Sequence, residues 1–190
     1  MTLVGKKIAI FAENGYEELE LWYPYYRLKE EGADVVLIGS GTSTKYVGKK
    51  GGYPVIVDTN INEVNSKDFD ALIIPGGWAP DNLRRHQKII DFTKEIFTQN
   101  KPVAAICHAG SLLVSANVLQ GKTATCFMAI KDDMINAGIN YVDKEVVVDG
   151  NLVTSRTPQD LPAFCKSIIK LLAWWYENSN IEVILYKRRR

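Results

Sequence analysis

Short apolar runs alternate along the chain with longer segments in which apolar residues recur at helical spacing. The short runs are typical of buried strands and predict strands within 6–12, 33–39, 69–77 and 101–107. The amphipathic segments predict helices within 16–32, 81–100, 108–119 and 157–178. Strands that alternate with helices in this way form a mainly parallel sheet with helices on both faces.

Smaller features fill the spaces between these elements. Residues 45–58 predict two short strands around a glycine turn, and residues 144–155 predict a hairpin turned at Asp149-Gly150. Residues 126–138 predict a short helical segment. Pro24 either kinks the first helix or marks its start.

The length of 190 residues fits one compact domain, which we assign to residues 1–176. Residues 177–190 form a C-terminal tail with a basic tip. The tail is consistent with an edge strand, an intermolecular contact or a frayed end.

Composition and charge narrow the choice of partners. The net charge of +1 gives no basic field for nucleic acid or acidic membranes, and no apolar run approaches the length of a membrane span. The N-terminus shows no signal peptide. Three widely spaced cysteines argue against a disulfide framework and for a reducing cytoplasm. With two histidines and no CxxC, we expect neither a metal site nor a cofactor.

The stretch KPVAAICHAG, residues 101–110, places a cysteine where a strand meets a helix. Small residues at Ala105 and Ala109 permit the tight strand–turn–helix of a nucleophile elbow at Cys107. The amides at the helix N-terminus favour a thiolate and can hold an oxyanion. A buried structural cysteine is the equal alternative, because small residues also flank ordinary core strands.

Two other stretches carry groups that can serve such a nucleophile. In IIPGGWAPDN, residues 73–82, Gly77 is a candidate second oxyanion donor; the alternative is an ordinary turn capped by Asp81. In GYEELEL, Glu17 and Glu20 lie three residues apart and share one helical face. A protonated carboxyl there would stabilise a thiolate, whereas the alternative is a solvated acidic first turn.

These stretches, taken in order with KKGGYPVIVD, IKDDMINAG and EVVVDGNLVTSRTPQDLPAF, resemble the PfpI-type intracellular proteases of the ThiJ/PfpI superfamily. The resemblance covers roughly residues 6–175. It implies a flavodoxin-like three-layer sandwich of the class I glutamine amidotransferase-like group. A glutamine amidotransferase proper is not expected, since that class uses a further downstream histidine that this chain lacks.

The resemblance also implies roles for the residues around the elbow. Cys107 matches the nucleophile, His108 the histidine beside it, and Glu20 the carboxyl that touches the thiol. The backbone amides of Gly77 and His108 match the oxyanion donors. Asp81 matches a triad acid that a neighbouring subunit donates, at a position where the family more often has Glu.

Other positions match the mouth of the site or depart from the family pattern. Glu17 matches a second acid near the substrate, and Lys50 matches a lysine at the mouth. Phe127 stands where close relatives have a tyrosine, so one hydroxyl is missing. Ala109 replaces a usual glycine, which is tolerated if its φ is negative.

The resemblance leaves three function classes open. The first is a cysteine peptidase in which the Cys107 thiolate attacks small peptides and His108 shuttles the proton. The second is a glyoxalase or protein deglycase acting on methylglyoxal and its adducts with the same cysteine and glutamate. The third is a stress sensor or chaperone in which Cys107 is oxidised. A cytoplasmic homo-oligomer, dimer or hexamer, with its site at the subunit interface is implied for the enzymes.

Overall fold

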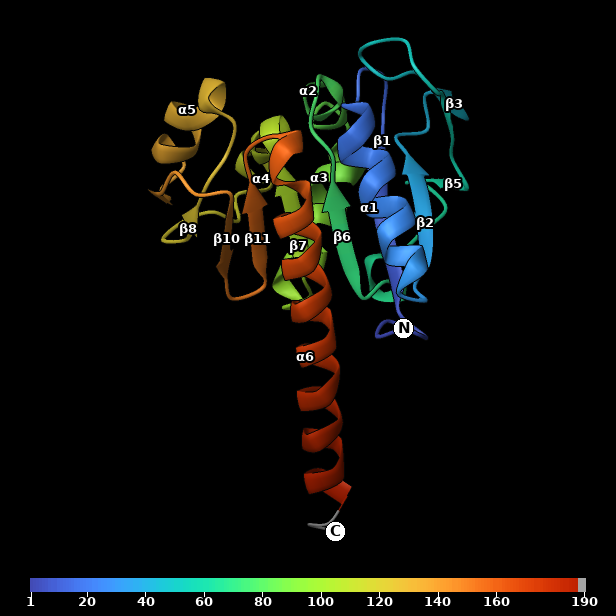
Figure 1. The fold of residues 1–190 in the computed structure, drawn as a ribbon, viewed down its shortest axis with the longest axis vertical. Coiled ribbons are helices and arrows are strands. Elements are labelled where there is room, and N and C mark those ends of the chain that lie inside the picture. Colours follow the sequence, from blue (N-terminus) through green and yellow to red (C-terminus); the bar gives the residue numbers. More distant parts are fainter. Residues whose placement is uncertain (188–190) are drawn as a thin grey trace.

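The computed structural model of the chain describes the backbone of residues 1–187 and the side chains of residues 1–174. Its centre is a seven-stranded sheet in the order β10-β11-β7-β6-β1-β2-β5 (Figure 1). All neighbouring strands are parallel except β10 and β11, which form an antiparallel hairpin. The strands are β1 (Lys7–Ala12), β2 (Asp34–Gly39), β5 (Thr59–Asn60), β6 (Ala71–Ile74), β7 (Val103–Ile106), β10 (Val146–Asp149) and β11 (Leu152–Ser155).

Helices cover both faces of this sheet, as the sequence predicts. The helices α1 (Glu18–Glu30) and α6 (Leu161–Lys187) pack on one face, and Figure 1 shows them side by side. The other face carries α2 (Ala79–Leu83), α3 (Gln87–Thr98), α4 (Gly110–Ala116) and α5 (Lys131–Asn136). Strand side chains alternate between two cores: Ile8 and Ile10 face α1, whereas Ala9 and Phe11 face α3.

Short elements complete the chain. The predicted strand pair in residues 45–58 is present as β3 (Lys45–Tyr46) and β4 (Val55–Ile56), which are antiparallel. A second small pair joins β8 (Thr123–Ala124) to β9 (Asn140–Tyr141). Four 3-10 turns are η1 (Ser66–Asp68), η2 (Cys107–Ala109), η3 (Met128–Ile130) and η4 (Pro158–Asp160). Within the described residues, no helix is both long and apolar enough to cross a membrane.

The structure corrects the single helix predicted for residues 81–100. The segment forms α2 and α3, which are separated by a break at Arg84–His86. His86 is extended, with φ −103° and ψ 112°, and occupies the N-cap position of α3 without a side-chain capping bond. The Arg84 guanidinium donates a hydrogen bond to Ser115 Oγ at 2.9 Å, so a contact with α4 holds the break. Helical periodicity alone does not reveal such a tertiary contact.

The predicted hairpin is present, but its turn lies one residue later than expected. Asp149 pairs with Leu152, which leaves Gly150 and Asn151 as the turn residues. The Asn151 side-chain amide donates hydrogen bonds to the carbonyls of Phe97 and Lys101, each at 3.0 Å. These bonds tie the turn to the end of α3.

Two further predictions concern the ends of helices. Helix α1 continues through Pro24, which therefore marks neither a start nor an end. Helix α6 runs to Lys187, past the boundary proposed at residue 176, so the tail up to there is helical and not an edge strand. Figure 1 shows this end of α6 projecting beyond the sheet. Residues 188–190 lie outside the described part of the chain.

Candidate active site

Cys107 occupies a nucleophile elbow at the carboxyl end of β7, where the chain turns into η2 and then α4. Its φ is +61°, in the left-handed region that costs an ordinary side chain about 1–2 kcal/mol. Strain of this kind concentrates at functional sites. Ala109 has φ −59°, so alanine fits there without strain, as expected from the sequence. The Cys107 side chain is buried, with 7% exposure.

The carboxyl of Glu20 lies against the thiol of Cys107. Glu20 is completely buried in the first turn of α1. Its Oε2 accepts a hydrogen bond from the Gly76 amide at 2.8 Å. Its Oε1 is buried without a hydrogen-bond partner among the described residues, and the carboxyl and the Cys107 thiol each shift the pKa of the other. The two acids of the site are therefore in direct contact and away from water.

Burial and mutual repulsion decide the protonation of this pair. Burial raises the pKa of Glu20 to about 7, and the neighbouring Glu17 adds to the increase. Burial, followed by the charge of Glu20, raises the pKa of Cys107 to about 12. Protonation of Glu20 removes that repulsion and supplies a hydrogen-bond donor to the sulfur. The pair thus favours a single negative charge, shared between carboxyl and sulfur.

Gly76 and Gly77 allow this contact because neither position has room for a side chain. A Cβ on Gly76 would lie 2.6 Å from Glu20 Oε2 and 2.7 Å from Cys107 Cβ. Gly77 has φ +75°, and a Cβ there would collide with Gly15 and, at 2.5 Å, with the Glu17 nitrogen. The amides of Gly77 and His108 face the Cys107 thiol and lower its pKa. These are the two donors that the sequence predicts for an oxyanion.

An ion pair between the exposed Lys49 and the buried Glu17 adds a positive charge beside the thiol. The Lys49 ammonium binds Glu17 Oε2, and Glu17 is only 5% exposed. This hydrogen bond raises the pKa of Lys49, and the charges of Cys107 and Glu20 raise it further. Lys49 in turn favours the charged forms of both Cys107 and Glu20. Glu17 is thus held at the site by a lysine.

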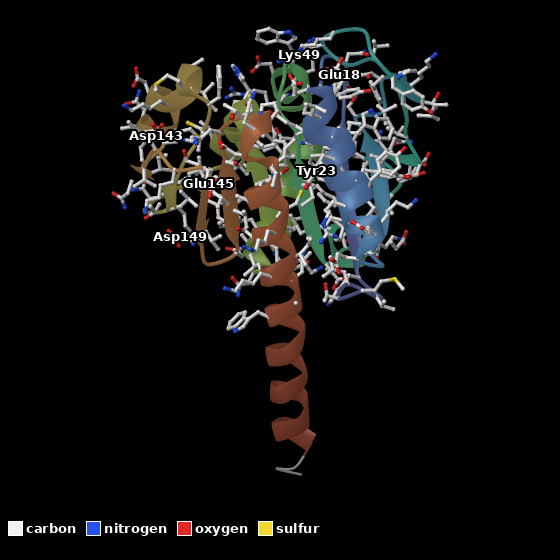
Figure 2. All side chains as sticks on the ribbon, in the orientation of Figure 1. Glu18, Tyr23, Lys49, Asp143, Glu145 and Asp149 are labelled. Atoms are coloured by element: carbon white, nitrogen blue, oxygen red, sulfur yellow. The ribbon has the colours of Figure 1, made fainter. Side chains whose placement is uncertain are left out.

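The lysine that reaches the site is Lys49, whereas the sequence prediction named Lys50. The Lys49 amide pairs with the Tyr16 carbonyl at 2.9 Å, and Glu18 Oε1 accepts the Lys50 amide at 2.9 Å. The loop is therefore fastened to α1, and Figure 2 shows Lys49 and Glu18 together at this end of the molecule. The two lysines are adjacent and chemically identical, so only the backbone pairing distinguishes them. A substrate-binding role for Lys50 stays untested.

His108 points its ring at two aromatic side chains. The ring lies 5.1 Å from the Phe127 ring and 5.8 Å from the Trp78 ring, centroid to centroid. Burial lowers the pKa of His108, and Asp81 opposes this effect by its charge. Asp81 is exposed, and no hydrogen bond joins it to His108 within the described chain. The His108 ring likewise makes no described hydrogen bond to the Cys107 sulfur. Trp78 was not anticipated from the sequence.

The geometry assembles a nucleophile, a proton carrier, two amide donors and a cation. These groups converge at the carboxyl ends of β7 and β6, where parallel sheets place their ligands. The arrangement can add a sulfur atom to a carbonyl carbon and stabilise the resulting oxyanion. Among the described residues, no group of three or more His, Cys, Asp and Glu side chains is placed to hold a metal ion.

Comparisons with known proteins agree with this geometry. A model of the DJ-1/PfpI family matches residues 6–171. "Deglycase PfpI" of Pyrococcus furiosus is 49% identical over 87% of this chain and 99% of its own length. "Putative cysteine protease YraA" of Bacillus subtilis is 43% identical over 89% and 99%. The crystal structure of Drosophila melanogaster DJ-1beta matches with a TM-score of 0.83 and 29% identity over 88% and 90% of the two chains. These names, together with the elbow, support an enzyme with a hydrolase type of activity.

The buried carboxyl predicts a pH-dependent stability. With a pKa of about 7 folded and 4.5 unfolded, Glu20 contributes stability below pH 4.5 that is lost as the pH rises through 7. The loss is about 3 kcal/mol. Glu20→Gln should therefore gain about 3 kcal/mol on wild type between pH 4.5 and 8, measured by urea unfolding. The exposed Glu30→Gln is the control, and a Glu20→Gln difference that does not change with pH would contradict the assignment.

The packing of Gly77 predicts that alanine destabilises the protein more at this position than at Gly121. Gly121 has nearly the same φ, +74°, with no atom near its Cβ position, so Gly121→Ala should cost about 1 kcal/mol. Gly77→Ala adds a clash with backbone atoms and should cost about 3 kcal/mol or more. It should also slow alkylation of Cys107. Equal unfolding free energies for the two variants would show that Gly77 is not tightly packed.

Proposed function

Since the chain belongs to the DJ-1/PfpI family, we propose that it is a deglycase-type hydrolase that removes methylglyoxal adducts, with Cys107 as nucleophile. The observation that carries the proposal is the identity of the group in contact with the thiol. That group is the carboxyl of Glu20, whereas the imidazole of His108 packs against Phe127 and Trp78. A Cys–His peptidase needs the imidazole within hydrogen-bond reach of the sulfur.

In the first step, the bond between the aldehyde carbon and the modified amine or thiol is replaced by a bond to the Cys107 sulfur. The Cys107 sulfur binds that carbon, and the amine or thiol of the modified molecule leaves with the cysteine proton. Free methylglyoxal reacts in the same way by addition of S–H across the aldehyde. The hydrogen-bond donors facing the sulfur, the amides of Gly77 and His108, then lie beside the developing oxyanion.

Glu20 performs the proton transfers that follow. Its carboxylate removes the proton from the sulfur-bearing carbon and returns it to the neighbouring ketone carbon, while the hydroxyl proton of the first carbon moves to the ketone oxygen. The first carbon is oxidised and the second reduced, so the fragment becomes a lactoyl thioester without an external oxidant. Water then releases lactate and restores the thiol. A pKa of about 7 suits a group that must accept and donate a proton near neutral pH.

We also propose that the enzyme is a cytoplasmic homo-oligomer, a dimer or hexamer, whose site includes Asp81 of a neighbouring subunit. Oligomers are frequent in the family. An exposed hydrophobic surface on α1 supports an interface, since Leu19, Tyr23 and Tyr26 are 58%, 39% and 61% exposed. They line a hollow of about 460 Å³. Three free cysteines fit a reducing compartment.

A variant panel separates the deglycase from the peptidase. Cys107→Ser and Glu20→Gln should each lower lactate formation from methylglyoxal by at least about a hundredfold. His108→Ala keeps the backbone amide and should lose no more than about tenfold. The same proteins are tested on fluorogenic peptides, and mass spectrometry follows oxidation of Cys107. Peptide cleavage that needs His108 as much as Cys107 would favour the peptidase. Oxidation without either reaction would favour the stress sensor.

The shared-site proposal predicts coupled substitutions. Asp81→Ala should lower kcat/KM about as much as His108→Ala, and the double variant should lose no more than either alone. Alkylation of Cys107 should stay largely intact, and Asp91→Ala serves as the surface control. Mixed oligomers of Asp81→Ala and Cys107→Ser subunits should regain activity, because some sites combine an intact residue from each chain. Unchanged activity in Asp81→Ala would refute the shared site.

A further inference from the structure

A cavity lies beside the candidate active site, at the same edge of the sheet. It has a volume of about 210 Å³, and its walls include Phe127, Tyr141, Asp143 and Arg156; we call it the Arg156 cavity. Arg156 follows β11, which pairs with β7 directly before Cys107. The Phe127 ring separates the cavity from His108, 5.1 Å from centroid to centroid. The Phe127 amide also donates to the Cys107 carbonyl at 3.3 Å.

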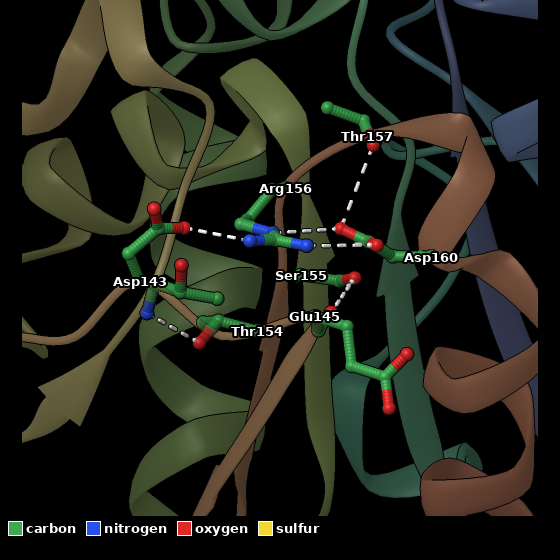
Figure 3. A network of polar contacts seen from close by, with 8 residues as sticks. Asp143, Glu145, Thr154, Ser155, Arg156, Thr157 and Asp160 are labelled. Atoms are coloured by element: carbon green, nitrogen blue, oxygen red, sulfur yellow. Dashed lines mark hydrogen bonds and ion pairs between the residues drawn. The ribbon is translucent and has the colours of Figure 1, made fainter.

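The guanidinium of Arg156 is held in place by the buried carboxylate of Asp160. Asp160 accepts two hydrogen bonds, from Nε at 2.9 Å and from Nη2 at 3.1 Å (Figure 3). The Asp160 side chain is 9% exposed and lies in η4, at the start of α6. A bidentate contact of this kind fixes the plane of the guanidinium as well as its position.

The remaining partner of Arg156 is far more exposed. Asp143 accepts a hydrogen bond from Nη1 at 2.7 Å, and its side chain is 60% exposed. Exposed ion pairs contribute about 0–1 kcal/mol, so a second carboxylate can displace Asp143 at little cost. The described contacts use three of the five N–H groups of Arg156. Two donors are therefore left for a ligand.

Other side chains of both charges lie around the cavity. Lys131 places its ammonium 5.0 Å from the centre of the Tyr141 ring. Once Asp143 is displaced, Arg156 and Lys131 face the charges of Asp160 and of Asp133, which acts on Cys126 in the cavity wall, so a ligand anion is recognised by the remaining guanidinium donors and not by an excess of positive charge. The rings of Phe127 and Tyr141 provide apolar walls, as is usual in pockets with a few polar anchors.

We propose that the Arg156 cavity binds the carboxylate of the amino-acid part of the substrate. The inference rests on the proposed function and narrows its substrate class. The preferred substrates are adducts on free amino acids or at the C-termini of short peptides. In this arrangement the dicarbonyl fragment lies at Cys107, and the carboxylate reaches past Phe127 to Arg156.

Matched substrates test the proposal. Methylglyoxal forms hemithioacetals with N-acetylcysteine, N-acetylcysteinamide and 2-(dimethylamino)ethanethiol, which are anionic, neutral and cationic. For wild type, kcat/KM should be at least about tenfold higher for the anionic adduct than for the neutral one. Asp143→Asn removes the competing carboxylate and should raise the value for the anionic adduct severalfold, with the neutral adduct unchanged. Asp132→Asn controls for a general change in surface charge.

A paired substitution removes the guanidinium without leaving Asp160 as an unpaired buried charge. Arg156→Gln combined with Asp160→Asn should abolish the preference for the anion while keeping activity on the neutral adduct, and thermal unfolding checks its fold. A preference for the cationic adduct that disappears in Asp143→Asn would overturn the proposal, because Asp143 would then be the recognising group. Equal activity on all three adducts would overturn it as well.

A binding measurement separates failure of this proposal from failure of the proposed function. N-acetylalanine and N-acetylalaninamide are titrated calorimetrically into Cys107→Ser, which cannot react. The carboxylate should bind and the amide should not, and the Arg156→Gln/Asp160→Asn change should remove binding. Binding without turnover of any adduct would refute the deglycase and keep the cavity assignment. Turnover without selective binding of the carboxylate would refute the cavity assignment alone.

Discussion

Burial of the Glu20 carboxyl against the Cys107 thiol is the constraint on which the rest of the site depends. Two acidic groups in contact and away from water cannot both ionise without a large cost. The fold meets this constraint with a hydrogen bond from the Gly76 amide to the carboxyl and with the amides of Gly77 and His108, which lower the pKa of the thiol. Those amides are in place because Gly76 and Gly77 leave no side chain between the elbow and α1.

The charged groups around Glu20 and Cys107 differ in their effect on the thiol. Lys49 favours the negative charge at the thiol, and Glu17 holds Lys49 in position. The His108 ring packs against Trp78 and Phe127, and burial favours its neutral form. The proton carrier closest to the sulfur is therefore a carboxyl, which suits proton transfer between adjacent carbons of a dicarbonyl more than departure of a peptide amine.

Much of the fold follows from local sequence, whereas part of the site does not. Alternating apolar runs predict the parallel sheet and both helical layers, and the resemblance points to Cys107, Glu20 and Gly77, which the structure brings together. The choice of Lys49 over Lys50 depends on backbone pairing with Tyr16, far away in sequence. The break before α3 depends on a contact between Arg84 and Ser115. Periodicity does not encode such long-range contacts, and neither does a short motif.

The central claim is that Glu20 stays protonated beside the thiol up to nearly neutral pH. Carbon-13 NMR of protein labelled at the glutamate carboxyl, with Glu20→Gln to assign the signal, measures this protonation directly. The account predicts a titration midpoint near the raised pKa of about 7. A midpoint near the ordinary value of 4.5 would contradict it, because Glu20 would then be ionised at neutral pH and could not donate a hydrogen bond to the sulfur.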